Sequence, residues 1–512
     1  MAREYDRPRR DSRDGWDSRD SRDSRDSRNS RPRNEQRLTR EPRDGRAPVR
    51  TARGVAFQLL LAVATDDAYA NLLMPKLLTQ AKLDSRDAGF AQELAFGTIR
   101  NALFYDGAIA VAAGRDLAEI DPEVRVVLEL GAHQLLGMRV PSHAALSETV
   151  DLAKQVLRPS LSGFVNGVLR RISERTRDEW LELQLSDAPN RVAKLAIQYS
   201  HPAWIIRALE DSLRIDGREA DLETLLAADN QAPLVNLVAL PGLATPDDLL
   251  DAGAVLGGVS PIGGELPDGD PAALRQVQDG KVRVQDQGSQ LAALALVHAP
   301  VVRAAKDNGP EEWLDLCAGP GGKAALLAAA AQASQAELAC NELQPHRAKL
   351  VQQALSRVNP DVYVRTGDGR DLGDDAPESF HRILLDAPCT GLGALRRRPE
   401  SRYRKQAKDV ADLSKLQREL FASAWKGLKP GGVLAYVTCS PHPGETVAII
   451  DWAEKTYGNN LELLDATAEM TKDNPALAAS GSRALTSTRK TVQLWPHIHG
   501  TDAMFIALVR KR

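Results

Sequence analysis

The sequence is poor in aromatic residues, has only four cysteines among 512 residues and contains no long apolar run. Its longest apolar stretches, such as VAFQLLLAV and AALLAAAAQA, are much shorter than the ~20 residues of a membrane-spanning helix. No apolar signal-peptide core follows the N-terminus, so we expect a cytoplasmic protein that does not bind a membrane. The cysteines show no repeated close spacing, which argues against a disulfide framework and a metal site and leaves free thiols.

The first 46 residues are of low complexity and contain almost no apolar side chain, with Ser-Arg-Asp repeated through DSRDSRDSRNSRPR. Such a segment has too little to bury and is expected to be disordered. Its charges can touch RNA weakly, but a solubilising tail is the simpler interpretation. The formal net charge of the whole chain, −3, neither favours nor excludes a nucleic-acid partner.

Residues 47–180 carry apolar side chains at helical three-four spacing, as in ARGVAFQLLLAVA and PEVRVVLELGAHQLL. Short breaks of Pro, Gly and Asp separate these segments, which is typical of a compact helical domain. Five arginines there either form a phosphate-binding face or are scattered over the surface, and the spacing leaves both interpretations open. They are Arg53, Arg86, Arg100, Arg170 and Arg171.

The rest of the chain divides into two further regions. Residues 181–279 are predicted to be a small α/β connector with Gly- and Pro-rich turns. From 280 to 512, short β-like apolar runs such as RILLDAPC and GGVLAYVTC alternate with helical segments. This alternation predicts a mainly parallel, doubly wound sheet. Ligands bind such sheets beyond the carboxyl ends of the strands, so residues that end strands are the candidate site residues.

The segment LDLCAGPGGKAALLA predicts a strand, a glycine-rich turn and a helix in succession. Gly319, Gly321 and Gly322 allow the backbone to approach a ligand closely, and the helix N-terminus offers unpaired N–H groups. The turn is not a phosphate loop, because Ala324 follows Lys323 where that motif needs Ser or Thr.

Acids end the three following strands. Glu342 can accept hydrogen bonds from both hydroxyls of a ribose, Asp368 can accept from the amino group of an adenine, and Asp386 ends the fourth strand. Together with the glycine turn they indicate an adenine nucleoside without a pyrophosphate. We therefore favour a methyl-donor site over a nicotinamide dinucleotide site, whose Gly-x-Gly-x-x-Gly spacing is missing.

Two of the cysteines, Cys389 in LLDAPCTG and Cys439 in YVTCSP, also follow predicted strands. Carbon 5 of cytosine is a poor nucleophile, and a thiolate that adds to carbon 6 activates it while a neighbouring acid stabilises the ring. The attacking thiol needs positive charge nearby, which Arg396–Arg398 or a helix N-terminus can supply. Spacing alone does not say which cysteine attacks.

The other two cysteines have a simpler interpretation. Cys317 and Cys340 are expected to lie inside apolar strands as small buried hydrophobic residues.

Several motifs together resemble those of the Nop2/Sun family of RNA cytosine-5 methyltransferases, and within it the bacterial 16S rRNA methyltransferase B (Sun/Fmu) branch. They are DLCAGPGGK, QPHR after an acid, GDGRDL, LLDAPCTGLGALRRRPE, LKPGGVLAYVTCS and GTDAMFIA. The helical segments RDAGFAQELAFGTIR, HAALSETVDLAK and GFVNGVLRRI resemble the NusB-like domain of that branch. The resemblance implies an all-α NusB-like N-terminal domain and a C-terminal α/β Rossmann-like class I methyltransferase domain.

The resemblance also implies roles for individual residues. Cys439 is the expected nucleophile, Cys389 the thiol that helps product release, and Asp386 the catalytic acid. Glu342 departs from the family, in which aspartate is commoner. The cofactor is expected to be S-adenosylmethionine, held by Cys317, Ala318, Gly319, Pro320, Gly321, Gly322, Lys323, Glu342, Asp368 and Asp386.

The implied reaction is methylation of carbon 5 of a cytosine in 16S rRNA, of the cytosine 967 type, through a covalent adduct between cysteine and carbon 6. The expected partner is 16S rRNA or a small-subunit precursor, and we expect a monomer. Two alternatives stay open: the same chemistry on tRNA or another RNA, and a non-catalytic NusB-like RNA-binding protein.

Overall fold

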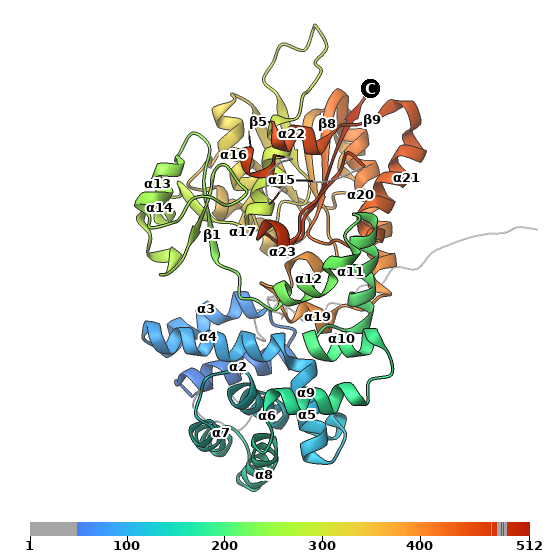
Figure 1. The fold of residues 1–512 in the computed structure, drawn as a ribbon. Coiled ribbons are helices and arrows are strands. Elements are labelled where there is room, and N and C mark those ends of the chain that lie inside the picture. Colours follow the sequence, from blue (N-terminus) through green and yellow to red (C-terminus); the bar gives the residue numbers. More distant parts are fainter. Residues whose placement is uncertain (1–48, 473, 479–482, 484, 486–488) are drawn as a thin grey trace, which may run out of the picture. The chain divides into compact units, whose positions relative to one another are not determined.

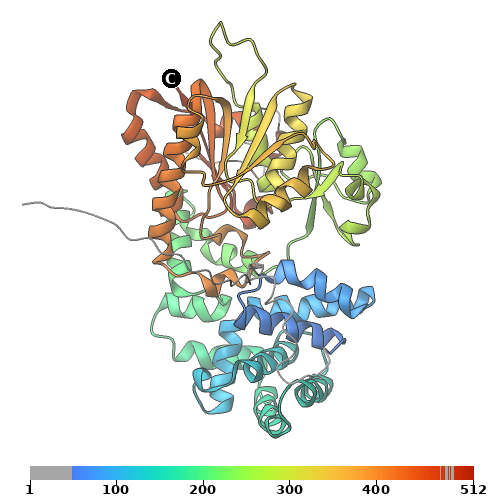
Figure 2. The same ribbon diagram turned by 180° about the vertical axis from the view of Figure 1, so that it is seen from behind.

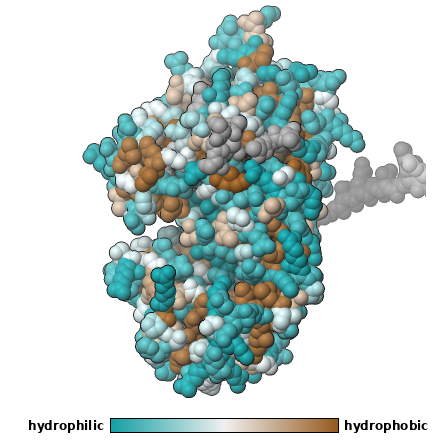
Figure 3. All heavy atoms as spheres, in the orientation of Figure 1, coloured by the Kyte–Doolittle hydropathy of each residue, from teal (hydrophilic) through white to brown (hydrophobic). Residues whose placement is uncertain are grey.

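The computed structural model describes residues 49–472, 474–478, 483, 485 and 489–512, which lie in one compact unit, Val49–Arg512. The predicted tail, residues 1–46, lies outside them. Among the residues described, no helix is long and apolar enough to span a membrane. Hydrophilic residues cover most of the face seen in Figure 3, and hydrophobic ones form small separate groups.

The N-terminal region is helical (Figures 1 and 2). Side chains cap three of its helices: those of Thr51, Asp84 and Thr176 each accept a hydrogen bond from a backbone N–H of the first turn. Helix α6 is the most deeply buried, and its apolar side chains contribute to one core with those of its neighbours. The helices are α2 (Ala52–Thr65), α3 (Ala70–Ala81), α4 (Ser85–Arg100), α5 (Ala102–Ala113), α6 (Pro122–Leu136), α7 (Ser142–Val156), α8 (Ser162–Ser173) and α9 (Arg177–Ser186).

The five arginines of this region do not form one exposed face. Arg100 is only 6% exposed, and its guanidinium donates to the Arg396 carbonyl oxygen at 3.2 Å. Burial lowers the pKa of Arg100 to about 10. Arg171 donates to the Ala112 carbonyl at 2.8 Å. The hypothesis of a five-arginine phosphate face is therefore wrong for Arg100, which instead joins the helical region to a segment nearly 300 residues away.

The following region contains helices and a small sheet. Strand β1 pairs antiparallel with β2 on one side and β3 on the other. Strand β3 lies just beyond residue 279, and the domain boundaries at residues 180 and 279 stay predictions. The elements are α10 (Arg191–Tyr199), α11 (Ala203–Ile215), α12 (Leu222–Asp229), β1 (Val235–Ala239), α13 (Pro246–Asp251), β2 (Gly263–Leu266), α14 (Arg275–Gln278) and β3 (Val282–Val284).

The C-terminal region is built on a sheet with the order β10-β11-β8-β7-β4-β5-β6, and β9 pairs with β11. Strands β4 to β8 run parallel to one another, whereas β11 runs antiparallel to β8, β9 and β10. The predicted, mainly parallel sheet is confirmed. The strands are β4 (Glu312–Asp315), β5 (Glu337–Glu342), β6 (Tyr363–Thr366), β7 (Phe380–Asp386), β8 (Leu428–Thr438), β9 (Leu461–Leu463), β10 (Val492–Gln493) and β11 (Phe505–Lys511).

Helices cover both faces of this sheet, because its strands are apolar on both sides. In β7, Leu384 belongs to the core beneath α15, α16 and α17, whereas Ile383 and Leu385 belong to the core beneath α20 and α21. This alternation gives the doubly wound arrangement seen in Figures 1 and 2. The helices are α15 (Gln287–His298), α16 (Gly322–Ala333), α17 (Pro345–Leu355), α18 (Leu372–Asp375), α19 (Ser401–Arg404), α20 (Asp409–Gly427), α21 (Val447–Tyr457), α22 (Ala466–Thr471) and α23 (Pro496–His499).

Helix α19 connects the segment after β7 to the helical region. Arg402 is fully buried, and its guanidinium donates to the carbonyls of Arg100 (3.1 Å) and Asp229 (2.8 Å) and to the Asn230 side chain (2.7 Å). The nearby Glu400 carboxylate accepts a hydrogen bond from the Ala70 N–H at 3.2 Å. Because a buried guanidinium is costly unless it is hydrogen-bonded, these contacts hold the segment firmly.

Candidate functional site

The glycine turn begins where β4 ends at Asp315 and leads into α16 at Gly322. Gly321 has φ of +103°, and a Cβ on Gly319 would lie 2.2 Å from a Glu342 carboxylate oxygen. Both positions therefore require glycine. Cys317 lies in this turn and is only partly buried, so its predicted place inside an apolar strand is wrong. Cys340 is buried inside β5, as expected.

Glu342 ends β5, and its carboxylate supports the turn. It accepts hydrogen bonds from the N–H groups of Gly319 and Gln344, each at 3.0 Å. Arg347 contacts the same carboxylate at 3.7 Å and donates to the Gly319 carbonyl. A carboxylate has about four acceptor positions, so two remain for a ligand.

Asp368 lies two residues beyond the end of β6 and is paired with a cation. Its carboxylate contacts the Arg370 guanidinium at 2.6 Å, and Arg370 also reaches Glu419 at 3.1 Å. The hydrogen bonds from Arg370 hold the pKa of Asp368 below its usual range. The predicted acid lies beyond the carboxyl end of β6, but a ligand would share its carboxylate oxygens with Arg370.

Asp386 is the last residue of β7, and it accepts a hydrogen bond from Lys323 at 2.9 Å. Lys323 also lies 3.3 Å from the Ser289 hydroxyl. Burial opposes the charge of Lys323, but Asp386 outweighs it and the pKa of the lysine is raised. The ion pair joins the first turn of α16, which carries Lys323, to the end of β7, just before the segment that carries Cys389.

A fourth strand-end acid, Asp315, was missed by the sequence reasoning. It is 1% exposed, and neither carboxylate oxygen has a hydrogen-bond partner of good geometry. Burial and the neighbouring Asp386 raise its pKa to about 8, only partly offset by Lys323 and the Cys317 N–H. The signal was present in LDLCAG, where the acid ends β4 as Glu342 ends β5.

The structure brings the two predicted site cysteines together. Cys389 follows β7 and Cys439 follows β8, and these parallel strands pair along most of their length. Their Sγ atoms are 3.4 Å apart, and both residues are partly exposed. Cys340 and Cys317 take no part in this pair.

The charges around the two thiols differ. Cys439 has a lowered pKa because Cys389 hydrogen-bonds to it and the cations Lys323 and Arg398 are near. The pKa of Cys389 is raised well above its usual value by the hydrogen bond with Cys439, by burial and by the acids Glu445 and Asp386. The cations near Cys439 and the acids near Cys389 therefore favour the thiolate on Cys439 over the thiolate on Cys389.

Of the three arginines expected to supply positive charge, Arg398 contributes to the lowered pKa of Cys439. Arg396 donates to the Gly500 carbonyl at 2.9 Å. Arg397 is engaged by Asp286 (2.7 Å) and Asp502 (2.9 Å). The second cation near the thiol is Lys323, which sequence reasoning had assigned to the cofactor alone.

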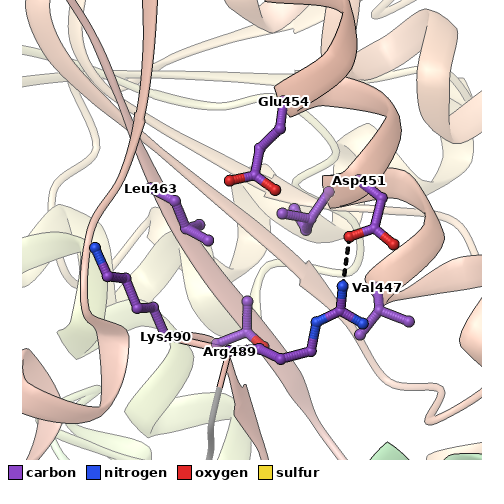
Figure 4. Close-up of a pocket in the computed structure, with 8 residues that line it drawn as sticks. Val447, Asp451, Glu454, Leu463, Arg489 and Lys490 are labelled. Carbon is purple, nitrogen blue, oxygen red and sulfur yellow. Dashed lines mark hydrogen bonds and ion pairs between the residues drawn. The ribbon is translucent and has the colours of Figure 1, made fainter. Parts of the chain in front are cut away.

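A separate cavity of about 310 Å³ lies between α21, β9 and residues 489–491 (Figure 4). Its wall contains an ion pair between Arg489 and Asp451 at 2.7 Å. None of the predicted site residues lines it, so it is distinct from the cysteine pair and the glycine turn.

Comparisons with known proteins agree with this geometry. Residues 302–510 match the family described as 16S rRNA methyltransferase RsmB/F, and residues 50–174 match the NusB family. The putative methyltransferase Rv1407 of Mycobacterium tuberculosis (strain ATCC 25618 / H37Rv) is 45% identical over 475 residues, which cover 92% of this chain and 99% of that protein.

Ribosomal RNA small subunit methyltransferase B of Salmonella arizonae is 33% identical over 410 residues, covering 78% of this chain and 89% of that protein. The crystal structure of PH0851 has the same fold, with a TM-score of 0.72 at 21% identity, and covers 90% of this chain and 99% of that one. The predicted combination of a helical domain and an α/β domain is confirmed. The chain belongs to the RsmB/F (Sun/Fmu) family of rRNA methyltransferases and carries an N-terminal NusB domain.

Proposed function

We propose that this protein transfers a methyl group from S-adenosylmethionine to carbon 5 of a cytosine in 16S rRNA, with Cys439 as the nucleophile. The observation that carries the proposal is the cysteine pair, with Sγ atoms 3.4 Å apart and the cations near Cys439. RNA as the substrate class is supported by the family and by the rRNA methyltransferases to which the chain is similar.

The residues around the glycine turn fit the donor. The carboxylate of Asp315 suits the ammonium group of an amino acid, because a buried acid with no hydrogen bond of good geometry is stabilised by a cation. Glu342 retains acceptor positions for ribose hydroxyls, and Asp368 can accept from an adenine amino group beside Arg370. When bound, S-adenosylmethionine supplies an electrophilic methyl group.

The protein's own residues then divide the work. The Cys439 thiolate adds to carbon 6 of the cytosine, which makes carbon 5 nucleophilic. Asp386, held by Lys323, lies beside Cys439, and its carboxylate can accept a hydrogen bond from the cytosine amino group and from ring nitrogen 3 once that nitrogen is protonated. A base, such as a water molecule, then takes the carbon-5 proton, the double bond between carbons 5 and 6 re-forms, and Sγ leaves carbon 6 with the electron pair of their bond. The protonated Cys389 thiol then hydrogen-bonds the departing Cys439 thiolate.

The proposal is tested by transfer of labelled methyl groups to small-subunit RNA from a strain that lacks this modification. We expect wild type to methylate one cytosine at carbon 5, Cys439→Ala to show neither transfer nor adduct, and Cys389→Ala to accumulate a protein–RNA adduct on a denaturing gel. Cys340→Ala, a buried cysteine away from the pair, is the matched control and should keep its activity.

Two results would count against this scheme. An adduct that accumulates in Cys439→Ala and is lost in Cys389→Ala would reverse the two roles. Transfer to tRNA but not to small-subunit RNA would reject the substrate while leaving the chemistry intact.

A further inference from the structure

A buried carboxylate lies directly behind the two cysteines. Glu445 is fully buried and ends a short 3-10 turn, Pro443–Glu445, after Cys439. Its carboxylate accepts hydrogen bonds from the Thr390 N–H (2.7 Å), the Thr390 hydroxyl (2.5 Å) and the Ser440 hydroxyl (2.6 Å), and Gln417 lies at 3.4 Å. Thr390 follows Cys389, and Ser440 follows Cys439.

These donors fill the acceptor positions of the carboxylate, so it has none left for a ligand. The Thr390 and Ser440 hydroxyls also contact each other at 3.1 Å. The main chain of Glu445 is held as well, because its carbonyl accepts a hydrogen bond from the buried Tyr436 hydroxyl at 2.7 Å. Glu445 is therefore a fixed point to which both cysteine-bearing segments are attached.

We propose that Glu445 is a positioning residue that sets the distance and direction of Cys389 Sγ relative to Cys439 Sγ, through Thr390 and Ser440. The positioning itself is a property of the folded chain, whereas its effect on catalysis rests on the function proposed above. A displacement of about 1 Å at a reacting group can cost about 100-fold in rate. Loss of this carboxylate should therefore slow the reaction without weakening RNA binding.

The sheet should survive the loss of the carboxylate. The Gly393 N–H donates to the Cys439 carbonyl at 2.9 Å, and the Ala387 N–H donates to the Val437 carbonyl at 2.8 Å. These backbone bonds keep the two segments adjacent. What is lost is the restraint on the residues next to the two thiols.

The first test needs neither RNA nor cofactor. Diamide removes one hydrogen from each thiol, so that Cys389 and Cys439 form a disulfide while the reagent is reduced to a hydrazine. The rate of disulfide formation depends on how the two Sγ atoms face each other, and peptide mapping by mass spectrometry identifies the bond. We expect Glu445→Gln to form the disulfide at least about tenfold more slowly than wild type. The amide replaces one of the two carboxylate oxygens with an NH2 group, which then faces either the Thr390 N–H or the two hydroxyls instead of accepting from them.

Two further variants make the test specific. Thr390→Val removes the hydroxyl but keeps the N–H and the side-chain shape, so it should slow disulfide formation less than Glu445→Gln does. It also gives a result if Glu445→Gln folds poorly. Ser414→Ala is the matched control, because the Ser414 hydroxyl donates to the Gly444 carbonyl at 2.8 Å and not to the carboxylate. It should form the disulfide at the wild-type rate.

The second measurement is methyl transfer. We expect Glu445→Gln to lower kcat by about 10- to 100-fold and to leave the KM for RNA within about threefold. If folded Glu445→Gln and Thr390→Val form the disulfide at the wild-type rate and keep the wild-type kcat, the positioning role is overturned. If wild type transfers no methyl group to any RNA, the proposed function fails, and the disulfide rates still decide whether Glu445 positions the thiols.

Discussion

Glu445 and Asp315 are both buried carboxylates at the same sheet, but their surroundings are opposite. Glu445, behind the segment after β8, accepts hydrogen bonds from three well-placed donors. Asp315, at the end of β4, has no partner of good geometry. The first belongs to the cysteine region and the second to the glycine turn.

The difference distinguishes a part of the scaffold from a part of a binding site. A buried acid whose acceptors are filled holds its donors in place and has little left to offer a ligand. A buried acid without donors destabilises the protein when it is charged, and a cationic ligand relieves that cost. Under the proposed function, the cysteine region is therefore preformed, whereas the donor site at the glycine turn is completed by its cationic ligand.

Isosteric amide substitutions should give opposite effects at these two acids, and this is the largest effect we expect. An unfolded aspartate has a pKa of roughly 3.9, whereas that of Asp315 is raised to about 8. The folded state keeps a proton that the unfolded state has lost, so this residue lowers stability as the pH rises from about 4 through 8. Asp315→Asn should remove that loss, and the gain is at most about 6 kcal/mol above pH 8.

Glu445→Gln should instead lower the free energy of unfolding by about 2 to 4 kcal/mol. The NH2 group of the glutamine would face hydrogen-bond donors of Thr390 or Ser440 that a carboxylate oxygen now accepts. Urea unfolding at several pH values between 5 and 9 measures both variants. Isothermal titration should also show weaker binding of S-adenosylmethionine to Asp315→Asn. Equal destabilisation by the two substitutions would show that Asp315 is a satisfied structural acid and would end the contrast.

Lys323 links the two regions, so its removal tests whether they are electrically coupled. Lys323→Met should raise the pKa of Cys439, because it removes a cation and leaves Asp386 unpaired. We expect iodoacetamide to alkylate Cys439 about tenfold more slowly at pH 7, with the pH profile displaced upward by about one unit. Lys426→Met breaks a lysine–aspartate pair with Asp374 elsewhere and is the control. An unchanged profile in Lys323→Met would mean that the thiolate does not depend on the glycine turn.

The sequence alone predicted the residues whose position follows from topology. Asp386, Cys389 and Cys439 each follow a strand, and neighbouring parallel strands end at the same edge of a sheet, so their proximity could be expected. The structure then places the two Sγ atoms 3.4 Å apart. Their separate roles came from the family resemblance and stay predictions.

What could not be predicted depends on contacts between distant segments. The groups that donate hydrogen bonds to the Glu445 carboxylate include Thr390, 55 residues earlier in the chain. No local sequence pattern predicts such a contact. Arg100 looked like a surface cation in its helix, yet it meets a carbonyl 296 residues away. Asp315 was visible at a strand end, but its lack of partners is a property of the packed core.

The smallest effect should come from Arg398, which is exposed and contributes to the low pKa of Cys439 from the solvent side. Its guanidinium lies over the Tyr69 ring at 5.9 Å, which limits its movement. Because solvent screens exposed charges, Arg398→Gln should slow Cys439 alkylation by only about twofold at low salt. In roughly 1 M salt, where the screening length is about 3 Å, the difference should vanish. The Lys323→Met effect should persist, because the Lys323 side chain is only 11% exposed. Lys415→Gln, an exposed lysine of α20, serves as the control. If salt abolished both effects equally, Lys323 would act as a surface charge, and the glycine turn would have no privileged influence on the cysteine pair.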